Sequence, residues 1–102
     1  MIVIFSHGKE SGPWGSKIKA LALIAKKHGF SVDSIDYSNI SSPDHRADHL
    51  LQVIKGIDED IVLVGSSMGG YVSLVTSETV KVKAMFLLAP ALYMDDYEKK
   101  VY

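Results

Sequence analysis

Short strand-like runs alternate along this chain with segments of helical periodicity, and this alternation restricts the fold more than any other feature of the sequence. The strand-like runs cover residues 2–5, 30–36, 61–64 and 84–89, and three of them are apolar throughout, as in strands covered on both faces. A strand–helix order repeated in this way is typical of a parallel sheet with right-handed crossovers. We therefore expect a three-layer α/β/α fold with a parallel sheet, in a single domain spanning residues 1–102.

The helical segments carry start and stop signals. The first ends at Gly29, which suits the position after a helix C-terminus. The second begins with Ser42 as N-cap and Pro43 at the first helical position, and Gly56 ends it. The third follows the third strand directly. Residues 94–102 are weakly patterned and fit the start of a further helix.

The composition is that of an ordinary soluble domain, with 47% hydrophobic residues, 23% charged residues and a formal net charge of −1. A charge so close to zero argues against a nucleic-acid partner. No apolar run approaches the roughly 18–20 residues of a membrane span, and the N-terminal run is too short for a signal peptide. The absence of cysteine excludes disulfides and thiolate metal sites and fits a reducing compartment. We expect a cytoplasmic protein with no membrane contact, no cofactor and no metal.

The segment VLVGSSMGG joins the third strand to the third helix and contains the pattern G-x-S-x-G, formed by Gly65, Ser67 and Gly69. A serine in a sharp strand-to-helix turn is lifted above the sheet edge, which is the geometry of a nucleophile elbow. The N–H of Met68 would then point into the space above the hydroxyl, at a helix N-terminus that favours negative charge. The alternatives are a plain turn with small residues and an anion-binding loop, although neither phosphate-loop glycine pattern fits.

Three segments together resemble the α/β-hydrolase superfamily, and most closely its small bacterial serine esterases. The opening FSHGKESGPWGSKIKAL resembles the first block of these enzymes, in which a strand is followed by HG, a short loop and a helix. GSSMGGY resembles their nucleophile elbow, and FLLAPALYM resembles the strand that follows. The similarity spans nearly the whole chain in the right order. It implies the strand order 2-1-3-4.

The resemblance also implies roles for individual residues. Ser67 would be the nucleophile, and the backbone N–H groups of Met68 and Lys9 would form the oxyanion hole. His7 and Gly8 would support the first loop, as Gly65 and Gly69 support the elbow. The reaction would be hydrolysis of a small acyl ester through an acyl-serine intermediate, and it requires a base to take the serine proton.

The sequence departs from the family pattern after Ser67. In this fold the acid and then the histidine follow the serine along the chain, but all four histidines of this sequence precede it. We therefore expect the N-terminal part of a hydrolase, with impaired activity. Asp95 or Asp96 is a candidate acid, and His7 is a weaker candidate base. The competing hypotheses are a non-catalytic ligand-binding or interaction protein on the same scaffold, and a flavodoxin-like nucleotide module.

Three further features have two interpretations each. His45 and His49 stand one helical turn apart and could share a zinc ion, but without an evident third ligand a solvated helix face is the better interpretation. Trp14, in the first loop, would either line an acyl pocket or cover the edge of the core. The apolar fourth strand would be an exposed sheet edge, so we expect either self-association through it or marginal stability.

Overall fold

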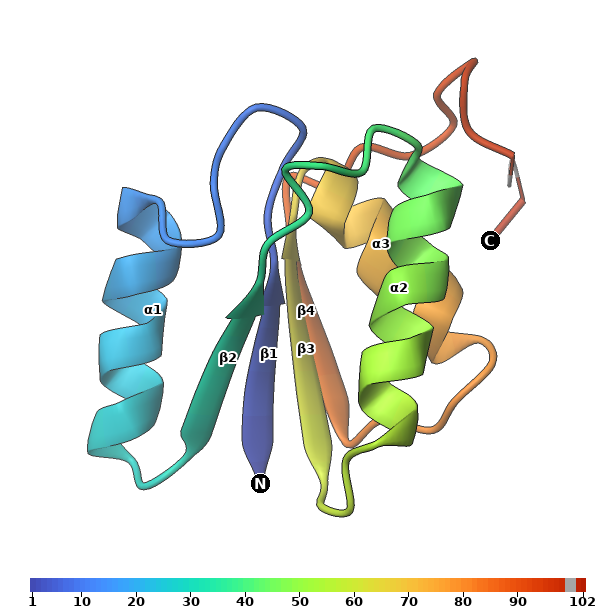
Figure 1. The fold of residues 1–102 in the computed structure, drawn as a ribbon. Helices are drawn as coiled ribbons and strands as arrows, with labels where there is room; N and C mark the ends of the chain where they lie inside the picture. Colours follow the sequence, from blue (N-terminus) through green and yellow to red (C-terminus); the bar gives the residue numbers. More distant parts are fainter. Residues whose placement is uncertain (99–100) are drawn as a thin grey trace.

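The computed structural model describes residues 1–98 and 101–102. Within these residues the chain forms one four-stranded sheet and three helices (Figure 1). The elements in chain order are β1 (Ile2–Ser6), α1 (Ser16–Lys27), β2 (Ser31–Ile35), α2 (Pro43–Lys55), β3 (Ile61–Ser66), α3 (Met68–Ser77) and β4 (Ala84–Leu88). The predicted alternation of strands and helices is confirmed.

The sheet is parallel throughout and has the strand order β2-β1-β3-β4, as predicted. One row of residues across it runs from Asp33 through Ile4 and Leu63 to Met85. Because β1 and β3 are neighbours and point the same way, the loops that follow them meet at the same sheet edge. Open α/β sheets bind their ligands at this carboxyl edge.

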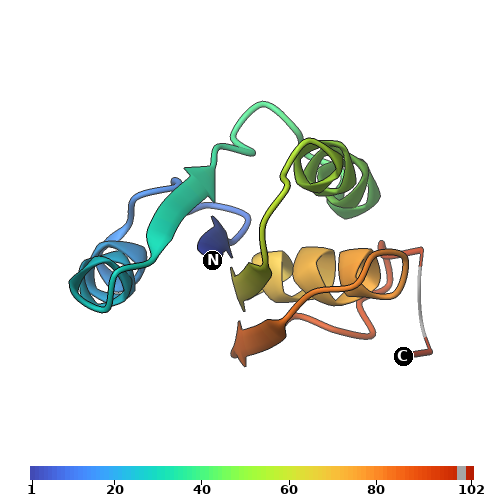
Figure 2. The same cartoon turned by 90° about the horizontal axis from the view of Figure 1, so that it is seen from below.

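The helices are divided unequally between the two faces of the sheet. Helix α1 lies on one face, and α2 and α3 cover the other (Figures 1 and 2). The α2–α3 face contains the larger core, centred on the fully buried Ile4, Leu50 and Leu63. The α1 face contains a smaller cluster around Phe5 and Ile18. The result is the expected three-layer arrangement.

The ends of the helices follow the local signals in the sequence. Ser42 Oγ accepts a hydrogen bond from the His45 backbone N–H at 3.2 Å, and Pro43 is the first residue of α2. Gly56 follows the last residue of that helix. Beyond α1, Gly29 takes a φ of +85°, which glycine adopts without strain.

The chain after β4 does not continue the helical pattern. Residues 94–98 form a turn rather than the helix that we expected, and residues 99 and 100 lie outside the described residues. The Tyr97 ring instead packs on Tyr71 with the ring centroids 4.3 Å apart. Asp44 on α2 accepts hydrogen bonds from the Tyr71 hydroxyl at 2.5 Å and from the Glu98 N–H at 3.2 Å. These contacts hold the segment after β4 against α2 and α3.

Candidate active site

Ser67 is the single residue between β3 and α3, and its backbone is strained. Its φ is 55° and its ψ is −118°, in a region that residues other than glycine rarely occupy. The residue is exposed, whereas Met68 and Gly69, which follow it, are buried. The structure therefore places the serine at the carboxyl edge of the sheet, where the strand turns into the helix.

Hydrogen bonds fix the Ser67 backbone on both sides. Its N–H donates to the carbonyl of Leu88 at 3.0 Å, and its carbonyl accepts from the N–H groups of Gly70 and Ala91, both at 2.9 Å. The elbow is thus tied to the end of β4 as well as to its own helix. Such bonds can hold a strained backbone that an isolated turn would relax.

Two glycines allow β3, α3 and β1 to approach one another closely. A Cβ on Gly65 would lie 2.2 Å from the carbonyl oxygen of Gly69. A Cβ on Gly69 would lie 1.9 Å from the carbonyl oxygen of Ser6 at the end of β1. No side chain fits at either place, so the glycines of the G-x-S-x-G pattern are required by packing around the turn.

The loop after β1 lies directly against the serine. A Cβ on Gly8 would be 3.3 Å from Cβ of Ser67. Gly8 is buried, and its N–H donates to Ser11 Oγ at 3.1 Å, while the next residue, Lys9, is exposed. The structure brings Gly8 to Ser67 and places Lys9 one residue further along this loop.

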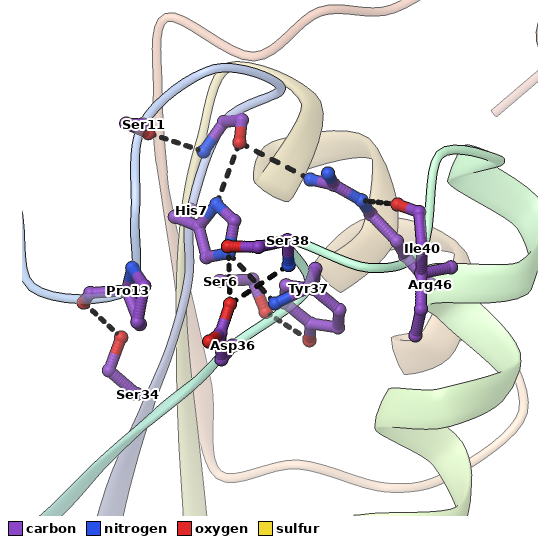
Figure 3. A network of polar contacts seen from close by, with 11 residues as sticks. Ser6, His7, Ser11, Pro13, Ser34, Asp36, Tyr37, Ser38, Ile40 and Arg46 are labelled. Atoms are coloured by element: carbon purple, nitrogen blue, oxygen red, sulfur yellow. Dashed lines mark hydrogen bonds and ion pairs between the residues drawn. The ribbon is translucent and has the colours of Figure 1, made fainter.

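His7 is buried beneath this loop with both ring nitrogens engaged (Figure 3). Its Nε2 accepts a hydrogen bond from the Tyr37 N–H at 2.9 Å. The proton must therefore be on Nδ1, which donates to the Gly8 carbonyl at 2.7 Å. Neither nitrogen is left to take a proton from Ser67, so His7 supports the loop and is not available as a base.

Tyr37 completes the layer below His7. Its hydroxyl and Ser6 Oγ lie 2.8 Å apart, both buried. Burial raises the pKa of the Tyr37 hydroxyl well above its ordinary value, so the group is neutral and forms an uncharged hydrogen bond. The nearby Asp36 is exposed, and hydrogen bonds from Ser38 lower the pKa of its carboxyl group.

Sequence reasoning missed Tyr37 and also Arg46 on α2. The Arg46 side chain is buried and donates to the carbonyl oxygens of Ile40 and Gly8. The helical spacing of the apolar residues on α2 could have predicted that Arg46 is buried. Arg46 precedes the buried Ala47 by one residue and Leu50 by one turn, so it falls on the inward stripe of the helix.

A small cavity reaches the elbow at Ser66, and Ser67 is not part of its lining. Its volume is about 280 Å³, and it lies between the first loop, the start of α1 and Ser66. Trp14 is not part of its lining, and the indole is 41% exposed. Trp14 therefore does not line this cavity, and it is not among the residues of either hydrophobic cluster.

Among the described residues, no hydrogen bond joins Ser67 to a candidate triad partner or metal ligand. Asp95 and Asp96 are exposed on the segment after β4, and His45 and His49 are exposed on α2. His49 packs edge-on against the Tyr37 ring. The described part of the chain contains no group of three or more residues arranged to hold a metal ion. Among the described residues, no helix is both long and apolar enough to span a membrane.

Comparison with known proteins gives the family. The sequence matches the uncharacterised protein family UPF0227 over residues 2–99. The chain belongs to this family. The fold is also similar to the crystal structure of a candidate hydrolase of the alpha/beta superfamily from Xanthomonas campestris pv. campestris, with a TM-score of 0.87 and 30% sequence identity over 92% of this chain. No curated protein matches the sequence.

The solved relative is the longer protein, because the chain spans 61% of its length. The family match and the strand order both agree with an α/β-hydrolase-like fold.

Proposed function

We propose that this chain is a serine acyl hydrolase that acts on a small ester-like substrate through Ser67. The strained Ser67 backbone carries the proposal, because a positive φ on a serine costs on the order of 1–3 kcal/mol. A turn selected only for close packing would have glycine at this residue, as it has at Gly65 and Gly69. The exposed hydroxyl is a reason to keep serine there.

The proposed chemistry is acyl transfer to water. Ser67 Oγ attacks the substrate carbonyl carbon while its proton passes to a base, and the carbonyl oxygen becomes an oxyanion. The N–H of Met68, at the start of α3 where helix N–H groups have no helical partner, would donate to that oxyanion together with the N–H of Lys9. The alcohol leaves with a proton from the base. Water then cleaves the acyl-Ser67 ester and restores the hydroxyl.

The base is the missing component of the described residues. The histidine nearest to Ser67 in the fold, His7, has both nitrogens engaged. We therefore propose that the chain acts slowly by itself, since an oxyanion hole without a complete triad retains about 10³–10⁴-fold catalysis over water. Free imidazole in solution would substitute in part for the absent side chain.

The test is covalent labelling with a fluorophosphonate, followed by intact-mass and peptide mass spectrometry. We expect the wild type to gain one phosphonyl group on Ser67, faster as imidazole is added. Ser67→Ala should gain none. Ser66→Ala, which removes the neighbouring hydroxyl and keeps the elbow serine, is the matched control and should be labelled like the wild type. Absence of labelling at every imidazole concentration would refute the proposal.

A non-catalytic ligand-binding protein is the second candidate, and the engagement of both ring nitrogens of His7 favours it. It predicts no labelling but saturable binding of a short-chain alkyl amide, which resembles an ester and resists hydrolysis. Amide chemical shifts of Gly8, Ser67 and Met68 would report such binding. Shifts confined to these residues, without any phosphonyl adduct, would select this candidate over the hydrolase.

A further inference from the structure

Arg46 is the only arginine of the sequence, and it is buried with 2% of its surface exposed. A buried cation is costly unless it has compensating partners. Within residues 1–98 and 101–102, no carboxylate lies close enough to form an ion pair with it. Its partners are instead backbone carbonyl groups, and these identify what the charge does.

The guanidinium joins two loops through its fork of donors. Nε donates to the Ile40 carbonyl at 2.6 Å, and Nη1 donates to the Gly8 carbonyl at 3.2 Å. The guanidinium carbon also lies 5.5 Å from the centre of the Tyr37 ring, a favourable distance for a cation–π contact. Figure 3 shows Arg46 reaching from α2 toward His7 and Ile40.

The Gly8 carbonyl consequently has two donors on its buried side, Arg46 Nη1 at 3.2 Å and His7 Nδ1 at 2.7 Å. The described residues contain no cis peptide bond. In a planar trans peptide the C=O of one residue and the N–H of the next point in opposite directions. Fixing the Gly8 carbonyl toward the interior therefore turns the Lys9 N–H away from it, to the outer side of the loop.

The loop lies against the elbow at Gly8. Gly8 lies against Ser67, at the 3.3 Å approach described above, and Lys9 is exposed. Among the residues that the structure describes, the Lys9 N–H has no hydrogen-bond acceptor. It is thus a free donor on the residue that follows Gly8, which lies against the exposed Ser67.

We propose that Arg46 is a positioning residue for the oxyanion hole: by holding the Gly8 carbonyl inward, it directs the Lys9 N–H toward the space above Ser67. The inference rests on the proposed hydrolase function, since it assigns a role within that site. A charged donor also polarises the peptide group that it binds, which strengthens the N–H on the other side as a donor. Arg46 acts through the Gly8–Lys9 peptide and does not touch the substrate.

The test compares Arg46→Met and Arg46→Lys with the wild type in two measurements. The first is the orientation of the Lys9 N–H, measured by residual dipolar couplings in the ligand-free protein. The second is the rate of Ser67 phosphonylation in the presence of imidazole. We expect Arg46→Met to change the Lys9 coupling and to lower the rate about tenfold or more, since loss of a whole oxyanion donor costs about 10²–10³-fold. Arg46→Lys should fall between the two.

Leu50→Ala is the matched control, because Leu50 lies one turn further along α2, is fully buried and belongs to the core. It should destabilise the protein while leaving the Lys9 coupling and the labelling rate unchanged in the folded fraction. If Leu50→Ala and Arg46→Met lower the rate equally at equal stability, Arg46 has only a structural role and the inference is overturned.

Two further outcomes separate the inference from the proposed function. A labelled wild type together with an Arg46→Met protein of unchanged coupling and rate overturns the inference alone. A wild type that is never labelled overturns the proposed function and, with it, the catalytic role of Arg46. Should Arg46→Met fail to fold, Arg46→Lys decides. One ammonium cannot reproduce the fork to Ile40 and Gly8, so unchanged coupling and rate there would also overturn the inference.

Discussion

The two faces of the sheet differ in how completely they are covered. On the α2–α3 face, side chains such as Leu50 and Leu63 are fully buried. On the other face α1 stands alone beside β2 and β1, and no described helix lies over β3 and β4 (Figure 2). A groove of about 520 Å³ opens there, lined mainly by apolar side chains, and Phe86 on β4 is 59% exposed.

The candidate site is positioned by the closed face. Arg46 reaches it from α2, and the start of α3 packs against the end of β1. Ser67 lines neither the groove nor the smaller cavity beside Ser66. We therefore expect changes on the open face to affect stability and association, and changes on the closed face to affect the site.

The largest expected effect contrasts one leucine from each face. Leu63→Ala should lower the free energy of unfolding by about 3 kcal/mol, because it leaves a cavity in a closed core. Leu88→Ala, in a residue that lines the groove and is only partly buried, should cost about 1 kcal/mol. Urea denaturation followed by circular dichroism gives both values. Equal losses would mean that the two faces are equally well covered in solution.

The next largest effect is a pH dependence of stability that arises on the closed face, which is the face covered by α2 and α3. Burial raises the pKa of Tyr37 in the folded protein, so an unfolded chain loses this proton at lower pH. The contribution of Tyr37 to the free energy of unfolding is fully present below about pH 10. It is lost as the pH rises further, by about 1.4 kcal/mol per pH unit. Denaturation at pH values from about 9 to about 11, roughly one unit either side of the pKa of a free tyrosine, measures how steeply the free energy of unfolding falls with pH.

Tyr37→Phe should flatten this alkaline slope, although it also leaves Ser6 Oγ without its partner. Tyr93→Phe, at a ring that is 65% exposed, is the matched control and should keep the wild-type slope. A Tyr37→Phe protein whose stability still falls as steeply as that of the wild type would assign the effect to other groups.

The smallest effect concerns the open face. We expect the chain to self-associate through the groove and the β4 edge, since exposed apolar edge strands tend to pair. Phe86→Lys should weaken the association about tenfold, equivalent to about 1.4 kcal/mol. Leu23→Lys, which changes an exposed leucine of α1 outside the groove lining, should leave it unchanged. Sedimentation equilibrium measures the constants, and a wild type that stays monomeric at high concentration contradicts the expectation.

The order of elements could be predicted because apolar period and turn residues act locally, whereas the strand order was implied by the resemblance to the α/β-hydrolases. Element ends were less accurate where tertiary contacts decide them. Phe30 was predicted as strand, but its N–H bonds to the Ala25 carbonyl at the end of α1. The helix expected after residue 94 is replaced by packing of Tyr97 on Tyr71, which no local pattern encodes.

At the site, the elbow could be predicted because its glycines and serine lie close together in the sequence, from Gly65 to Gly69. The Arg46 contact could not be predicted from local pattern alone, since Gly8 lies 38 residues away along the chain. Helical spacing indicates that the side chain points inward, but not which carbonyl it meets. The free Lys9 N–H likewise depends on a peptide orientation that only the fold determines.

The tight approach of Gly69 to the end of β1 limits which residues of this region can be substituted. A Cβ on Gly69 would lie only 1.9 Å from the carbonyl oxygen of Ser6. The first turn of α3 and the end of β1 are therefore packed too closely to admit a side chain between them. Substitution of Gly69 by any larger residue is therefore expected to prevent folding, whereas exposed residues of the loop after β1, such as Lys9, have room to vary.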